Sequence, residues 1–274
     1  MRLRFRDGFI LSPRGDLLVF LGPLVLAALV VFGTWGIAGG DIGVPPWAFV
    51  LLVVGCDVAH VYSTAFRTYL DPVERARRPV LYTVVPVACF AAGVALHLLG
   101  SARLFWSVLA YLAAFHFVRQ QYGWMAFSAR KAGETSRLDR LLDRVAIYNV
   151  TVFPLLWWHA HLPRAFHWFV PDDFAAGLTP AVTDFLLPLH WALNALYLSR
   201  QAWLGVFGTG LNRGKLLVWA TTLIAWYGGI VVLDSDLAFT ATNVLAHGIP
   251  YLAVVHRYGA ARWRSAAARA APAG

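Results

Sequence analysis

The stretch FHFVRQQYGWM, residues 115–125, places His116, Arg119, Gln120 and Gln121 inside a long apolar segment. A segment of this length and hydropathy is typical of a helix that crosses a membrane. An ionisable side chain that faces hydrocarbon costs about 2.5–3.5 kcal/mol on insertion scales. The stretch therefore predicts a membrane helix whose polar face is buried against other helices.

Composition extends this prediction to the whole chain. Of 274 residues, 59% are hydrophobic and 14% are charged, whereas soluble domains are roughly 45–50% apolar and about 25% charged. Apolar runs of membrane-spanning length recur along nearly the entire sequence. We therefore expect an all-α, polytopic integral membrane protein with one domain over residues 1–274 and short basic tails at 1–16 and 257–274.

The apolar runs and the positions of Lys and Arg predict the topology. We expect about eight transmembrane helices, near 17–38, 46–66, 80–99, 103–127, 142–161, 182–205, 215–234 and 237–256. Outside these spans, nearly all Lys and Arg residues lie in alternate connections and in both tails, which predicts that both termini are cytoplasmic. The expected location is a bacterial-type inner (cytoplasmic) membrane.

The charge and the cysteines exclude several classes of protein. The net charge is +9, but the basic residues flank apolar spans and form no aromatic-interleaved patch, so we expect membrane lipids as partners and no nucleic acid. Cys56 and Cys89 form no CxxC or CxxCH pattern, which argues against a disulfide framework and against covalently attached haem.

Polar residues are concentrated in the even-numbered spans, at helical spacings of three and four. Each of these spans carries one central histidine. The polar faces comprise Asp57, His60, Thr64 and Arg67; His116, Arg119, Gln120 and Gly123; His190, Asn194, Tyr197 and Gln201; and Asn243, His247 and Tyr251. Because these four helices run in the same direction, their histidines can meet at comparable depths.

A converging set of histidines predicts a metal site. Imidazole binds Fe, Zn and Cu, and a shell of histidines with a carboxylate suits non-haem iron. We expect His60, His116, His190 and His247 to be ligands, with Asp57 as a further ligand or as the residue that orients His60.

Other polar residues of these faces would surround the metal. Arg119, Gln120, Asn194 and Asn243 are the expected contacts to a cofactor. Tyr197 and Tyr251 are the expected catalytic residues, as proton donors or substrate contacts.

The plan of about eight helices with intramembrane histidines, including the HG of AHGIPY and the HF of FHFVRQ, is similar to that of the bacteriorhodopsin-related β-carotene dioxygenases. The resemblance covers helix count and four histidines; RQQYGW and DVAHVYSTAFR match no motif of that family. It implies a histidine-rich membrane oxygenase in which iron acts on a lipophilic small-molecule substrate.

Other functions fit the same residues. A bis-histidine haem is the closest alternative cofactor. Intramembrane His, Asp, Arg and Tyr also line proton or ion paths in transporters, and polar side chains can pair between helices for structural reasons alone. Arg67, Arg119, Arg200 and Arg257 lie near the cytoplasmic helix ends, where they either extend to lipid phosphates or hold an anionic headgroup or carboxylate.

Overall fold

The computed structural model is built almost entirely of helices, and it describes residues 3–270, with side chains described through residue 264. The first half of the chain contains β1 (Phe5–Arg6), α1 (Pro13–Asp16), η1 (Leu17–Leu21), α2 (Gly22–Ala38), α3 (Pro46–Ala48), η2 (Phe49–Val58), α4 (Ala59–Ser63), η3 (Thr64–Arg67), α5 (Pro72–Arg77), α6 (Pro79–Ala95), η4 (Leu96–Gly100) and α7 (Ala102–Lys131). The second half contains α8 (Arg137–Ala160), α9 (Pro180–Val206), β2 (Leu211–Asn212), α10 (Arg213–Trp226), η5 (Tyr227–Val232) and α11 (Asp236–Ala270).

Within the described residues, five helical segments are long and apolar enough to cross a membrane: Pro13–Ala38, Pro46–Arg67, Pro79–Gly100, Arg213–Val232 and Asp236–Arg264. These segments indicate a membrane protein. The other three expected spans coincide with α7, α8 and α9, helices of 30, 24 and 27 residues whose polar residues keep them out of this group. The count of eight spans and the cytoplasmic position of both termini remain predictions.

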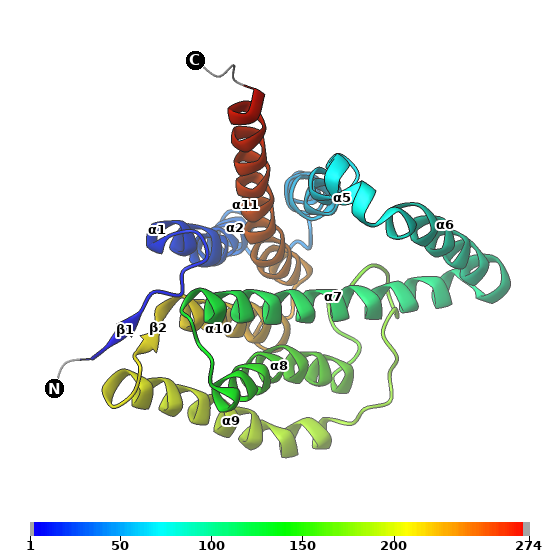
Figure 1. The fold of residues 1–274 in the computed structure, drawn as a ribbon. Coiled ribbons are helices and arrows are strands. Elements are labelled where there is room, and N and C mark those ends of the chain that lie inside the picture. Colours follow the sequence, from blue (N-terminus) through cyan, green and yellow to red (C-terminus); the bar gives the residue numbers. More distant parts are fainter. Residues whose placement is uncertain (1–2, 271–274) are drawn as a thin grey trace.

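The outer surface has the character expected next to lipid. The most apolar window of the Pro79–Gly100 segment has no buried residue, and α6 projects at the edge of the molecule (Figure 1). Phe90 and Leu99 there are 75% and 88% exposed. Soluble proteins rarely expose apolar surface on this scale, so contact with acyl chains accounts for it.

The helices pack around α11, which begins in the interior of the bundle and extends away from it (Figure 1). α11 packs against α2, η2 and α4 and also against α10, whereas α7 packs against α8 and α10, and α8 packs against α9. The first set buries small apolar residues such as Ala27, Ala238 and Ala241, which allow close approach of the helices.

Several helical segments are π-helical. η1, η2, η4 and η5 have this form, and η2 leads directly into α4. A π-helical stretch shifts the register of the helix that follows it. η2 therefore sets the direction in which the side chains of α4 point.

A pair of strands and a short helix lie outside the expected spans. β1 and β2 form a short parallel pair that joins Phe5 to Leu211, and α5 follows Asp71 within the second connection. Asp71 caps α5 by accepting from the backbone N–H groups of Val73 and Glu74. Both elements bind connecting segments to the helical bundle.

A buried ion cluster joins α10 to the connection after α7. The Lys215 side chain is fully buried, and its Nζ lies 2.6 Å from Glu134 Oε2 and 3.0 Å from Asp143 Oδ1. Asn212 also donates to Glu134 Oε1 over 2.7 Å. One buried ammonium therefore compensates two largely buried carboxylates.

Replacing the lysine of this cluster by an apolar residue should destabilise the protein strongly. Lys215→Met leaves two carboxylates buried without their cation, and breaking a buried ion pair in this way costs about 3–5 kcal/mol. Thermal unfolding of the purified protein in detergent measures the effect. The control is Lys131→Met, at the exposed end of α7, which should leave the melting temperature nearly unchanged; equal stability of both variants would contradict this account.

A second ion pair ties α5 to α11 and should make stability depend on acid pH. Arg262 donates to both carboxylate oxygens of Asp71, and this bond lowers the pKa of Asp71 from 3.8 to about 2. Since the folded pKa lies below the unfolded value, the stabilisation is present above about pH 4 and is lost as the pH falls towards 2. The melting-temperature difference between the parent protein and Asp71→Asn should shrink across that window; a constant difference would refute the assignment.

Candidate metal centre

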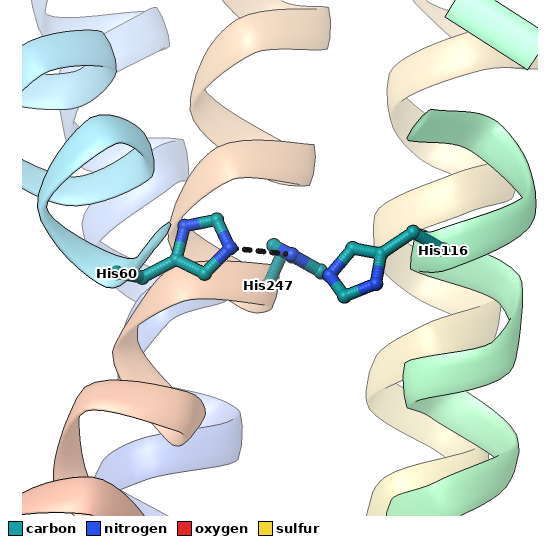
Figure 2. Close-up of side chains that lie close together, drawn as sticks. All are labelled: His60, His116 and His247. Atoms are coloured by element: carbon teal, nitrogen blue, oxygen red, sulfur yellow. Dashed lines mark hydrogen bonds between the residues drawn. The ribbon is translucent and has the colours of Figure 1, made fainter. Parts of the chain in front are cut away.

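Three of the expected histidines converge in the interior. His60 on α4, His116 on α7 and His247 on α11 each offer one nitrogen, and these three nitrogens all lie within 4.8 Å of one another. The rings of His60 and His116 are both directed towards His247 (Figure 2), with centroids 4.5 and 5.1 Å from its ring and 6.4 Å from each other. His60 Nε2 and His247 Nε2 are 3.0 Å apart.

The close approach of α11 to η2 depends on a glycine beside His247. A Cβ atom at Gly248 would lie 2.6 Å from Cys56 Sγ and 3.1 Å from the Cys56 carbonyl oxygen. Only a residue without a side chain permits this contact between the helices. Gly248 therefore lets α11 bring His247 within reach of His60.

His247 is held by α7 through its ring and through its backbone carbonyl. It stacks on Phe117, with ring centroids 3.5 Å apart and planes inclined by 3°. Gln120, one turn along α7 from His116, donates its side-chain N–H to the His247 backbone carbonyl over 2.7 Å. His247 Nδ1 is buried and has no hydrogen-bond partner among the described residues. Contacts with α7 therefore fix the position of the ring without using its nitrogens, which stay available to the histidine cluster.

Polar residues of η2, η3 and α11 lie near His60. Asp57 Oδ1 lies 3.3 Å from His60 Nδ1, and the hydroxyl groups of Thr64 and Tyr251 are 2.8 Å apart. The Tyr251 ring lies 5.8 Å from the His60 ring. Neither of these two atoms, Asp57 Oδ1 and His60 Nδ1, makes a hydrogen bond among the described residues, so the carboxylate lies beside His60 Nδ1 without a formed bond. A carboxylate that accepts from this nitrogen would orient the imidazole and leave the opposite nitrogen free to bind a metal.

A groove of about 590 Å³ opens beside the cluster. His116, Gln120 and Tyr251 line it at the histidine end. While His60 and His247 are buried, with 4% and 0% of their surface exposed, His116 is exposed. His116 is therefore the histidine through which the groove reaches the cluster.

The structure places the fourth expected histidine elsewhere. His190 on α9 is buried, its Nδ1 lies 3.1 Å from the Asn149 side-chain oxygen, and its Nε2 lies 3.2 Å from Asn194 Nδ2. It stacks on Phe153 of α8, with centroids 4.3 Å apart. Both ring nitrogens thus have amide partners, and His190 and Asn194 form a separate polar contact between α8 and α9.

Two further expected residues also lie apart from the three histidine rings. Tyr197 is buried beside Trp219, with ring centroids 5.3 Å apart. Asn243 lies one turn before His247 and donates to the Phe239 carbonyl over 3.1 Å, a bond within α11. Arg119 lines the groove, and it donates to the Tyr148 hydroxyl over 2.6 Å.

Two contributors to the site were missed from sequence. Gly248 is visible only as the residue after His247 in AHGIPY, and its role depends on which helix lies opposite. Phe117 is one of many apolar residues of α7, and Trp168, in the connection between α8 and α9, packs on its ring at 5.2 Å. That connection also buries Phe166 and Phe174 in the core, so it shields the side of Phe117 away from the histidines.

Enlarging the glycine should separate the two helices. Gly248→Val places a branched side chain against Cys56, so we expect weaker packing of α11 and loss of the His60–His247 contact. A cysteine pair introduced as His60→Cys and His247→Cys should be joined readily in the parent by a thiol-reactive crosslinker about as long as the two imidazoles that it replaces, and slowly with Gly248→Val. Gly33→Val on α2, where a Cβ meets nothing within 4 Å, is the control. Equal crosslinking in both backgrounds would contradict the role of Gly248.

The cluster unites residues that lie up to 187 positions apart in the chain. No protein-family model, curated protein or solved structure matches this chain. The chemistry of the site therefore rests on the side chains of the three helices themselves.

Proposed function

We propose that this protein is a membrane-embedded, metal-dependent oxidoreductase, an oxygenase that acts on a lipophilic substrate. The metal is non-haem iron, bound by His60, His116 and His247. The observation that carries the proposal is the convergence of three imidazoles from three separate helices at the end of an apolar groove.

The spacing of the nitrogens supports one shared ion. Nitrogens bound about 2.0–2.1 Å from a single ion are roughly 3.0 Å apart at a right angle and roughly 3.4 Å apart in tetrahedral geometry. His60 Nε2 and His247 Nε2 are 3.0 Å apart, which suits two adjacent ligands. A modest shift of the exposed His116 side chain would complete the set.

The same spacing favours non-haem iron over the haem alternative. The axial nitrogens of a bis-histidine haem lie on opposite faces of the ring, about 4 Å apart with the iron between them. The 3.0 Å separation of His60 and His247 is too short for these two histidines to be the axial pair. A shell of histidines with open positions is compatible with non-haem iron, and Asp57 lies behind His60, on the side of the ring away from His247.

The neighbouring residues have separate tasks in this proposal. Asp57 orients His60 and supports its basicity. Phe117 and Gln120 fix His247, one through its ring and the other through its carbonyl. Tyr251 presents a hydroxyl at the groove, where it can donate a proton or contact the substrate. Iron bound at the histidines would supply the activation of dioxygen.

Metal content tests the proposal directly. The purified protein should hold close to one iron per chain, and His60→Gln, His116→Gln and His247→Gln should each lose most of it, because each removes one of three ligands. Elemental analysis of protein that elutes as a single species measures this.

His190→Gln is the matched control, since His190 is an intramembrane histidine of similar burial whose nitrogens contact amides instead. It should keep its iron. Absence of metal from the parent protein, or equal metal in every variant, would refute the proposal. A Soret band in the absorption spectrum would replace it with the haem alternative.

A further inference from the structure

We propose that the groove binds an amphiphile with one anionic headgroup, a carboxylate or a phosphate, held by Arg67 and Arg119, with its apolar chain along the rest of the groove. This inference names the substrate class of the proposed oxygenase, and it rests on that function where it treats the bound amphiphile as a substrate. The binding itself depends only on the residues that line it.

The direction of the groove follows from the order of its residues. Every lining residue other than His116 follows the histidine of its own helix in sequence: Arg67 after His60, Phe127 after His116, and Tyr258 after His247. The groove therefore leads from the histidines towards the C-terminal ends of α4–η3, α7 and α11. A bound molecule would have one part near the histidines and another near these helix ends.

Two positive charges at the groove lack a compensating carboxylate. Among the described residues, neither Arg67 nor Arg119 takes part in an ion pair. Arg67 lies over the Tyr258 ring at 5.7 Å, and Arg119 lies over the Tyr122 ring at 5.3 Å. Arg119 uses one N–H on the Tyr148 hydroxyl, which leaves four of its five donors.

The acids nearest this end of the groove are already paired. Asp71 accepts from the Arg262 guanidinium over 2.6 Å and from the Tyr258 hydroxyl over 3.0 Å. Glu74 lies 3.5 Å from Arg78 and accepts from the Tyr82 hydroxyl over 3.1 Å. Neither carboxylate is left to neutralise Arg67, so an anionic ligand would find uncompensated charge there.

The remainder of the groove is apolar. Trp124, Phe127 and Val254 line it alongside Gly123, and a Cβ added at Gly123 would meet nothing within 4 Å. The volume of about 590 Å³ lies within the range of roughly 300–1,000 Å³ typical of small-molecule sites. An acyl chain fits this surface, whereas a small hydrophilic anion would leave most of it empty.

Helix geometry limits how far the headgroup lies from the histidines. Arg119 follows His116 by three residues, or about 4.5 Å along the helix, and Arg67 follows His60 by seven, or roughly 10 Å. A headgroup held between the two arginines therefore lies about 5–10 Å along the helices from the cluster. The carbon nearest the histidines would be only a few bonds from the headgroup.

Equilibrium binding to the purified full chain tests the inference. The probes are radiolabelled palmitate, dioleoyl phosphatidic acid and the uncharged hexadecanol. We expect at least one anionic probe to bind more tightly than hexadecanol, and Arg67→Gln with Arg119→Gln should weaken that probe by about tenfold or more while changing hexadecanol little, because the pair supplies charge-assisted hydrogen bonds. Preference for palmitate identifies a free fatty acid, and preference for phosphatidic acid identifies a phospholipid.

Matched variants guard against misfolding. Arg103→Gln, at the opposite end of α7, should bind all probes like the parent, and Arg67→Lys with Arg119→Lys should restore part of the anion affinity. Gly123→Phe should weaken every probe by filling the groove, whereas Gly33→Phe on α2 should not. Equal affinity for anionic and uncharged probes, or equal loss of all probes in the arginine double variant, would overturn the inference.

Iron content separates this test from that of the proposed function. The arginine double variant should retain the iron of the parent, since no arginine touches the histidine nitrogens. Preferential binding of an anionic probe by a protein without iron would support the binding site in the groove and refute the proposed oxygenase function. Iron without any preference for the anionic probes would uphold the metal site and refute the headgroup assignment.

Discussion

The contact between His60 and His247 is the interaction on which the rest of the site depends. Their Nε2 atoms are 3.0 Å apart, within hydrogen-bonding distance, and a buried imidazole without a polar partner is costly. This cost favours the arrangement in which α4 and α11 approach closely, and Gly248 is what makes that approach sterically possible.

The helices could be recognised from hydropathy because apolar runs of membrane-spanning length are rare outside membrane proteins. Each expected span coincides with a continuous helical run of the structure over nearly its whole length. The polar faces were also readable, since spacings of three and four residues place side chains on one side of a helix. What hydropathy cannot supply is the order of the helices in space, because lipid-facing and core-facing apolar residues are alike in composition.

His190 was assigned to the wrong site because the arrangement of the helices in space could not be read from the sequence. Its helix runs parallel to those of the other histidines in the expected topology, so sequence suggested a common site. In the structure α9 packs against α8, where Asn149 provides both a hydrogen-bond acceptor and a donor for the polar face of α9. Asn149, one of the few polar residues in the middle of α8, therefore provides His190 with a hydrogen-bond partner at that position. The Lys215 cluster escaped notice for a similar reason, because its partners lie more than 70 residues away.

The surroundings of the three histidines differ from one side to the other. Trp168 covers Phe117, and Phe117 covers one face of His247, so aromatic packing closes the site in that direction. On the exposed side of His116 the groove passes Arg119 first, and Trp124 and Phe127 follow farther along α7, with Arg67 at the end of η3. Since an apolar lining lowers the local dielectric, charges at the groove act more strongly than they would in water. A ligand of the class proposed above would therefore be oriented by its charged end, with its chain along the aromatic side chains of the groove.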